Sequence, residues 1–369
     1  MSRPIVAVTC CPDYGPALAP ALEAVLARLG GWDALVQPGR RVLVKPNLLS
    51  DATPEQAITT HPELVRQVVR GLKRAGAKVC VGDSPAGAMN LEQVWNKTGV
   101  ADVCTAEQVP LVSFEQGGTR QVTREGYTFA VAEAALETDL IVSLPKVKTH
   151  SLTTLTAAVK NFYGLLPGYQ KAQLHKAHPR PENFCRMLRA LHAALPPNVS
   201  IADGVIGMDG EGPANGRPVA LGFLAASTDA VALDLAICRA LRIDPRRVPY
   251  LQDAADAPFE LRGELPEIGD VQVPSGAGHL LRLIPESLLR LVLPLVWVRP
   301  TFDEKCIFCG RCAAACPQKA LTLERGQRPV LNSRLCIACC CCHEVCPAHA
   351  IRMRRSSLLR LLGTFRELK

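Results

Sequence analysis

Short apolar runs alternate with longer segments of helical periodicity over the first 260 or so residues. Six of these runs are rich in β-branched residues and bounded by Gly, Pro or Asp, which is typical of strands. They are 5–10, 41–47, 77–83, 139–146, 198–204 and 221–227. Helix-like runs follow several of them, at 62–76, 152–166 and 229–243. The alternation predicts a large N-terminal α/β domain with a mostly parallel sheet flanked by helices.

The most apolar stretch, 280–298, follows this region. It contains Arg282, Glu286, Arg290 and two prolines. A membrane-spanning helix needs about 20 mainly apolar residues, and charges at its centre are costly. The pattern therefore predicts an amphipathic segment and no transmembrane segment. Two interpretations stay open: a helix packed between domains, or a surface that lies on a membrane or lines an apolar substrate pocket.

One cysteine spacing occurs twice near the C-terminus. Each run has three cysteines separated by two residues, a fourth after three more, and then a proline. This spacing is typical of bacterial ferredoxins, in which the fourth cysteine of one run ligates the cluster of the other. We therefore predict two [4Fe-4S] clusters in a small α+β ferredoxin-like domain. The first would be held by Cys306, Cys309, Cys312 and Cys346, and the second by Cys336, Cys339, Cys342 and Cys316.

Alternatives to this interpretation involve the same cysteines. Zinc sites also use paired cysteines, but usually with about a dozen or more residues between the pairs. Clusters can also serve only to stabilise the fold of a small domain.

The stretch 320–335 between the runs predicts strand–turn–strand. Cys340 and Cys341 are additional to the spacing, and are either passive loop residues or groups that tune the cluster or allow ligand exchange.

Composition and charge narrow the class of protein. The chain has 369 residues, of which 48% are hydrophobic and 21% charged, as in globular proteins. Its net charge of +8 is concentrated at the end, with six Lys or Arg against one acidic residue in 350–369. The main body is nearly neutral, which argues against nucleic-acid binding. The basic tail is either a docking surface for an acidic electron donor or an ordinary solvated helix.

Cysteine usage bears on the compartment. Ten of the sixteen cysteines lie between Cys306 and Cys346, and the first residues show no secretory pattern. A disulfide framework would instead spread pairs through a small secreted chain. We therefore expect a reducing, cytoplasmic environment.

Polar residues gather at the ends of the predicted strands. In open α/β sheets, ligands bind at the carboxyl ends of the strands. Lysines within apolar sequence need water or an anionic partner, so the lysines predict a cradle for a carboxylate or phosphate. The substrate-binding candidates are Lys45, Asn47, Asp83, Ser84, Lys148, Asn161, Asp203 and Asp229. The catalytic candidates are Lys146, Lys160 and His150, with His150 as proton donor because its unperturbed pKa lies near neutrality.

Several of these residues also have structural interpretations. Asp83–Ser84 and Thr228–Asp229 could be helix N-caps, and His61 stands at a predicted helix start. The glycines of 207–216 predict a loop. No phosphate-binding loop or dinucleotide fingerprint is present, although a flavin stays possible. Asp203, Asp209 and Glu211 are oxygen donors that Mg²⁺ could use.

Seven motifs extend these observations. They are KPNLL (45–49), THPELV (60–65), GDSPAG (82–87), LPKVKTH (144–150), AVKNFYG (158–164), DGVIGMDGEGP (203–213) and STDAVALD (227–234). Together they resemble the family called domain of unknown function 362 (DUF362), many members of which carry a C-terminal ferredoxin module. The resemblance covers about residues 4–260 and the cysteine runs. It implies an iron–sulfur, oxidoreductive protein of the prokaryotic cytoplasm, and it implies no particular substrate.

These inferences combine into one prediction. We expect an α/β domain at 1–274, an apolar linker at 275–300, a ferredoxin domain at 301–350 and a basic tail at 351–369. The predicted function is an iron–sulfur oxidoreductase that takes electrons from a low-potential partner protein and reduces a small anionic substrate. The alternatives are an electron carrier or adaptor subunit without substrate chemistry, and a cluster-containing ligand sensor. The oligomeric state is left open.

Overall fold

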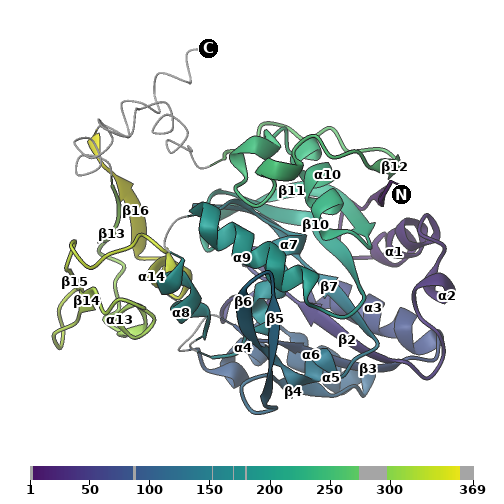
Figure 1. Ribbon diagram of the computed structural model, residues 1–369, viewed down its shortest axis with the longest axis horizontal. Coiled ribbons are helices and arrows are strands. Elements are labelled where there is room, and N and C mark those ends of the chain that lie inside the picture. The colour runs from purple at the N-terminus through teal and green to yellow at the C-terminus, as the bar shows by residue number, and fades with distance from the viewer. Residues whose placement is uncertain are drawn as a thin grey trace.

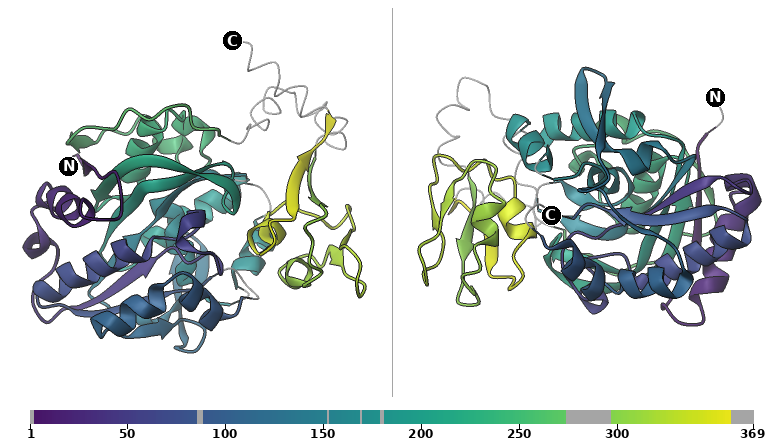
Figure 2. Two further views of the ribbon diagram at one scale, coloured as in Figure 1. Left: turned by 180° about the vertical axis from the view of Figure 1, so that it is seen from behind. Right: turned by 90° about the horizontal axis from the view of Figure 1, so that it is seen from below.

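The computed structural model describes residues 3–85, 89–151, 153–168, 170–178, 181–273 and 297–357. A large α/β domain lies beside a small domain formed by the last of these ranges (Figures 1 and 2). The predicted linker at 275–300 lies almost wholly outside the described residues, as does the tail beyond 357. In the described part, no helix is both long and apolar enough to cross a membrane.

One sheet forms the centre of the large domain, in the order β12-β1-β11-β10-β7-β2-β3-β4. Strands β4, β3, β2, β7 and β10 run parallel, whereas β11 is antiparallel to both β10 and β1. The strands are β1 (Ile5–Cys10), β2 (Arg41–Pro46), β3 (Lys78–Asp83), β4 (Leu111–Ser113), β7 (Leu140–Leu144), β10 (Asn198–Glu211), β11 (Asn215–Ser227) and β12 (Glu260–Arg262). The predicted mostly parallel α/β fold is confirmed.

Helices cover both faces of this sheet, and β2 shows why. Val42 and Val44 are buried in one apolar cluster and Leu43 in the other, because successive strand residues point to opposite faces. The first face packs against α1 (Leu18–Ala27), α3 (Pro62–Arg74) and α5 (Val100–Glu107). The second packs against α7 (Ala158–Asn161), α9 (Pro181–Ala193) and α10 (Ala230–Ala240). A strand that is buried on both faces has a continuous apolar sequence, which is why these strands could be predicted from the sequence.

Two predicted elements differ from the structure. The run 152–166 is not one helix: from residue 153 it holds β9 (Thr154–Thr156), α7 and the 3-10 turn η2 (Phe162–Leu165). Residues Thr154–Thr156 pair with β8 (Lys146–His150) instead. The glycine-rich stretch 207–216 is not a loop but the outer end of the β10–β11 hairpin. Glycine allows the two strands to pack closely here, because a Cβ on Gly216 would collide with the Asp209 carbonyl.

The small domain is a two-fold repeat. β13 (Val298–Phe302) pairs with β16 (Ile351–Arg355). β14 (Leu321–Thr322) pairs with β15 (Val330–Leu331), which confirms the strand–turn–strand predicted for 320–335. Short helices α13 (Arg311–Ala314) and α14 (Cys341–Glu344) follow the two cysteine loops. Because β16 belongs to this domain, we propose that the ferredoxin module extends to residue 355 and does not end at 350.

The backbone repeats the same unusual conformation in both halves of the module. Residues with positive φ occur in pairs at equivalent positions: Phe308 and Ala338, Gly310 and Cys340, Lys319 and His349. Left-handed backbone normally favours glycine, as at Gly310 (φ 74°). Cys340 adopts φ 65° at the matching position before α14. The additional cysteine therefore occupies the turn that a glycine makes in the first half.

Candidate functional site

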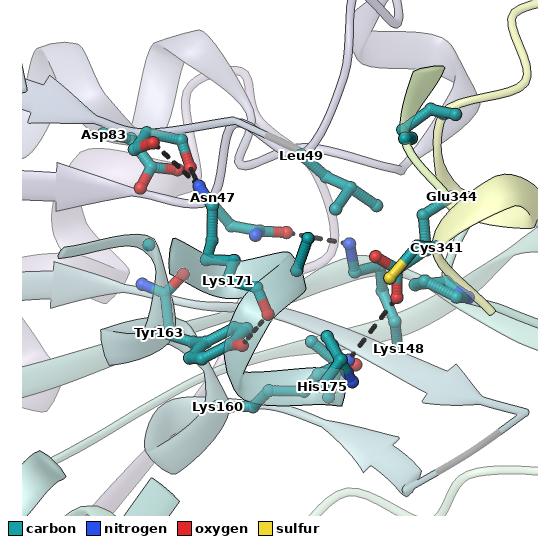
Figure 3. A pocket seen from close by; sticks show the side chains of 18 of the residues that line it. Asn47, Leu49, Asp83, Lys148, Lys160, Tyr163, Lys171, His175, Cys341 and Glu344 are labelled. Atoms are coloured by element: carbon teal, nitrogen blue, oxygen red, sulfur yellow. Dashed lines mark hydrogen bonds and ion pairs between the residues drawn. The ribbon is translucent and has the colours of Figure 1, made fainter. Parts of the chain in front are cut away.

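A cavity of about 900 Å³, its mouth included, lies between the two domains (Figure 3). Most of its wall comes from strand ends and helices of the α/β domain, whereas Cys341 and Glu344 reach it from α14 of the ferredoxin module. Seven of the eleven predicted non-cysteine site residues line it: Lys45, Asn47, Asp83, Ser84, Lys148, Lys160 and Asn161. The carboxyl ends of the strands thus do meet at one site.

Side-chain contacts fix the position of the module against the α/β domain. Arg311 of α13 contacts Asp51 at 2.9 Å. Asn215, at the tip of the β10–β11 hairpin, donates to the carbonyl of Ile351 and lies 2.9 Å from His349 Nδ1. The hairpin that the sequence suggested to be a loop is therefore part of the domain interface.

Lys45 is buried and fully hydrogen-bonded. Its ammonium lies 2.7 Å from Asp83 Oδ1 and donates to the Pro46 carbonyl at 3.0 Å and Asn161 Oδ1 at 3.3 Å. Burial lowers the pKa of Lys45, and the Asp83 carboxylate offsets part of that change. A Cβ on Gly164 would collide with Asp83 and come within 2.7 Å of Lys45 Nζ. With its three N–H groups in use, Lys45 holds the strand ends together.

Lys148 is also completely buried, but its hydrogen-bond partners are uncharged. It donates to Asn47 Oδ1 at 2.8 Å and to the Ile58 carbonyl at 2.6 Å. Burial and the nearby Lys160 hold the pKa of Lys148 well below its usual value. An ammonium has three donors, so one N–H is left for a ligand. An anion bound in the cavity would supply the negative charge that the hydrogen-bond partners of Lys148 do not provide.

Lys160, on α7, is the second cation available to a ligand. Its side chain is 12% exposed, and the nearest carboxylate oxygen, Glu344 Oε1, is 3.9 Å away. Burial lowers the pKa of Lys160, and Glu344 counteracts this. The separation is too long for a hydrogen bond. A bound anion could therefore accept hydrogen bonds from Lys160 without replacing the hydrogen bond of another group.

Sequence reasoning missed Lys171, which lies on α8 (Gln170–Ala177). Its ammonium donates to the carbonyl and hydroxyl oxygens of Ser84, both at 2.7 Å, and to the Pro85 carbonyl at 2.5 Å. Burial lowers the pKa of Lys171 to about 8. The polar sequence of α8 resembles an ordinary solvated helix and carries no signal of this role.

Aromatic side chains form part of the wall. Tyr163 donates a hydrogen bond to the Lys171 carbonyl at 2.6 Å. His175 stacks on Phe184 with ring centroids 4.2 Å apart, and burial lowers the pKa of His175 to about 4. The imidazole is therefore neutral at physiological pH. A neutral wall beside two lysines suits an organic anion that has an apolar part.

His150 lies behind the cavity wall. Its Nδ1 accepts from the Thr153 amide at 3.2 Å, so Nε2 carries the proton and donates to Glu344 Oε1 at 3.1 Å. Burial and Lys160 lower the pKa of His150 to about 3. The expectation that it titrates near neutrality is wrong, because the desolvated ring stays neutral. His150 positions Glu344 from behind.

Lys146, Asp203 and Asp229 are not part of the cavity. Lys146 pairs with Asp203 at 2.9 Å, and both contact the hydroxyl of Tyr14, at 2.8 and 2.6 Å. Asp203 also accepts from the His61 amide. Each charge is thus already compensated within the fold. Asp229 is the N-cap of α10, which matches the structural interpretation of that residue.

The three carboxylates considered for Mg²⁺ are not gathered into a site. Asp203 is engaged as described, and Asp209 is bound by Arg217 at 2.7 Å and by the Gln272 amide at 3.0 Å. Glu211 is exposed at the outer end of β10.

The cysteine runs enclose two smaller cavities. One, of about 330 Å³ with its mouth included, is lined by Cys306, Cys309, Cys312 and Cys346. The other, of about 350 Å³, is lined by Cys316, Cys336, Cys339 and Cys342, together with Cys340. The structure therefore brings together both sets proposed from the spacing, including the exchange of the fourth cysteines. Four cysteines around one cavity match the ligand set of a [4Fe-4S] cluster.

Backbone amides support the two exchanged cysteines. Ala320 N donates to Cys316 Sγ at 3.2 Å, and Ala350 N donates to Cys346 Sγ at 3.3 Å. Hydrogen bonds to cluster sulfurs tune the reduction potential. The two halves of the module thus give the fourth cysteine the same surroundings.

Comparisons with known proteins agree with these observations. The family model described as Domain of unknown function (DUF362) matches residues 42–239, and that of the 4Fe-4S binding domain matches residues 301–322. The thylakoid-associated protein sll1697 of Synechocystis sp. (strain ATCC 27184 / PCC 6803 / Kazusa) is 37% identical over 233 residues. That match covers 63% of this chain and 72% of the relative.

Two solved structures show a weaker similarity. The lactate racemase apoprotein from Thermoanaerobacterium thermosaccharolyticum aligns with a TM-score of 0.43 and 14% identity, over 64% of this chain and 57% of that one. A structural-genomics protein from Thermotoga maritima gives 0.38 and 12%, over 58% and 56%. The present chain thus spans little more than half of each.

Proposed function

This chain belongs to the DUF362 family and carries a 4Fe-4S domain, and from that premise we propose a ferredoxin-coupled oxidoreductase that reduces a small anionic organic substrate. One observation carries the proposal. The cavity with two available lysines also contains Cys341, which stands between the proposed cluster ligands Cys339 and Cys342. A ligand on the lysines would thus lie beside the second cluster.

The anionic nature of the substrate follows from the hydrogen-bond donors. Lys45 and Lys171 have all three N–H groups engaged, whereas Lys148 has one left and Lys160 makes only a long contact to Glu344. Lys148 and Lys160 would bind the carboxylate or phosphate of the substrate. Asn47 and Asn161 would hold Lys148 and Lys45 in place, and Asp83 and Ser84 would do the same for Lys45 and Lys171.

Reduction of a carbonyl or alkene group needs two electrons and two protons. The two [4Fe-4S] clusters, when bound, supply electrons one at a time. Lys160 can donate the first proton from its ammonium, regain a proton from solvent through the cavity mouth, and then donate the second proton. Neutral His150 keeps Glu344 in position and does not itself donate. The proposal involves neither a flavin nor Mg²⁺.

The test uses anaerobically prepared holoprotein with reduced clusters. We expect a metabolite extract to reoxidise the clusters of the wild type. Lys148→Met and Lys160→Met should slow this at least about tenfold, the equivalent of about 1.4 kcal/mol, with iron content unchanged. Lys176→Met is the matched control, since Lys176 is exposed on α8 and outside the cavity wall.

Two outcomes would contradict the proposal. Reoxidation that is equally fast in both lysine variants would remove the anion site. Reoxidation by protein fractions alone, with none by small molecules, would identify the chain as an electron carrier or adaptor.

A further inference from the structure

The large apolar side chains that are exposed in the described structure all lie in one part of it. Four large ones are exposed, and all four lie in the ferredoxin module: Ile307 (61%), Phe308 (43%), Val330 (63%) and Leu335 (45%). Their concentration around the cysteine runs marks a surface for interaction.

The two cysteine loops face different surroundings. Ile307 and Phe308 stand between Cys306 and Cys309 and line the first cysteine cavity, and Cys309 is itself exposed. In the second loop, Cys341 lines the interdomain cavity. The first cluster site is therefore open to solvent, whereas the second adjoins the cavity.

Basic residues lie beside these apolar side chains, because Pro329, next to Arg328, lines the same cavity as Ile307 and Phe308. Between residues 303 and 335, the exposed cations are Lys305, Lys319, Arg325, Arg328 and Arg334, against two exposed carboxylates, Glu304 and Glu324. Over 297–357 there are ten Lys or Arg and four Asp or Glu. Two clusters of about −2 each would still leave this segment at about +2. An apolar centre with a basic rim matches an acidic protein partner.

We propose that the surface formed by Ile307, Phe308 and Val330, with Lys305, Arg325 and Arg328 at its rim, is the docking site of an acidic one-electron carrier protein. One electron passes from the reduced carrier to the first cluster, and no bond forms or breaks. The site itself depends only on the 4Fe-4S domain. The further transfer of the electron, from the second cluster to a ligand in the cavity, rests on the proposed function.

A protein fits this surface better than a membrane does. Its apolar residues flank the proposed ligands of a redox centre. A redox partner must dock close to such a centre, because electron transfer needs a short distance. The described helices of the module, α13 and α14, have four residues each. Interfacial membrane helices need a long apolar face, which these helices cannot provide.

The test measures how fast an acidic flavodoxin, reduced to its hydroquinone, reduces the clusters of anaerobic holoprotein in a stopped-flow instrument. The double variant Arg325→Glu/Arg328→Glu changes exposed residues of the turn between β14 and β15, which contains none of the cysteines. Ile307→Ser changes the apolar centre. The matched control is Arg120→Glu/Arg124→Glu, which makes the same charge change on exposed residues of the α/β domain.

We expect the arginine double variant to react at least tenfold more slowly at low salt and to lose most of the salt dependence of the wild type. Ile307→Ser should also slow the reaction. Reduction by dithionite and iron content should not change, which separates docking from cluster loss and from any failure of substrate chemistry. Equal flavodoxin rates in all variants would overturn the proposal. Loss of binding to phosphatidylglycerol vesicles, with flavodoxin rates unchanged, would identify a membrane-docking surface instead.

Discussion

Glu344 of the ferredoxin module accepts a hydrogen bond at 3.1 Å from Nε2 of His150, which lies on β8 of the α/β domain. The same carboxylate oxygen lies 3.9 Å from Lys160 Nζ. One side chain of the module thus holds the interface and also balances charge in the cavity. These two roles can be separated by substitution.

Glu344→Gln keeps an oxygen that can accept from His150 but removes the negative charge near Lys160. We expect succinate, used as a model anion, to bind about fivefold more tightly, or by about 1 kcal/mol. Isothermal titration calorimetry on oxidised holoprotein measures this. Glu125→Gln, on an exposed residue of the α/β domain, is the control. Unchanged or weaker binding to Glu344→Gln would show that this carboxylate does not oppose the ligand.

Anion affinity should depend on pH through Lys171. Burial lowers the pKa of Lys171 to about 8, even with Asp83 and Glu115 nearby. As pH rises through about 8, the cavity loses this positive charge, so succinate affinity should fall, by up to about tenfold per pH unit for each proton lost. The pKa values of His150, about 3, and His175, about 4, mean that neither histidine changes its charge between about pH 5.5 and 7.

Lys171→Arg tests this assignment, because arginine stays charged. Succinate affinity measured against pH should then fall only at a higher pH. The same profile in the wild type and this variant would assign the titration to another group.

Asp234 holds the start of α7, the helix that carries Lys160. Its two carboxylate oxygens accept from the amides of Ala158, at 2.7 Å, and Val159, at 3.0 Å. Asp234→Ala should lower the free energy of unfolding by about 3 kcal/mol and weaken succinate binding, since α7 loses its anchor. Asp229→Ala is the matched control: it should cost about 1 kcal/mol by removing a helix cap, with succinate affinity unchanged. Urea denaturation and calorimetry provide the two readouts. An equal loss of affinity in both variants would contradict the anchoring role.

Gly164 leaves room for the Lys45–Asp83 pair. Gly164→Ala would place a methyl group against both side chains, so we expect the free energy of unfolding to fall by about 1–3 kcal/mol. Gly269→Ala should be nearly neutral, because a Cβ there meets no atom within 4 Å. Thermal denaturation under anaerobic conditions compares the two, and equal melting temperatures would mean that the pair adjusts freely.

The six predicted strands all occur, because a strand covered on both faces is a short apolar run that local sequence displays. Periodicity could not separate helix from strand at 152–166, where pairing with β8 decides the outcome. The two cysteine sets could be proposed from spacing alone, because three members of each set are close together in the sequence and the exchange of the fourth is typical of this spacing.

The cavity could be predicted only in part. Strand ends meet at one edge of a parallel sheet, so Lys45, Lys148 and Asp83 were recognisable as neighbours. Lys171 and Glu344 were not, because a surface-like helix and a separate domain bring them there through tertiary contacts. Lys146 appeared equivalent to Lys148, and only its pairing with Asp203 separates the two.

Cys341 and Glu344 complete the cavity from the second cysteine run, which we propose to be held in place by inorganic iron and sulfide. A newly made chain that lacks these inorganic components would have neither a defined second cysteine loop nor the wall that this loop provides. Cluster insertion would therefore come before ligand binding during maturation, and iron starvation would disable recognition of the ligand as well as its reduction.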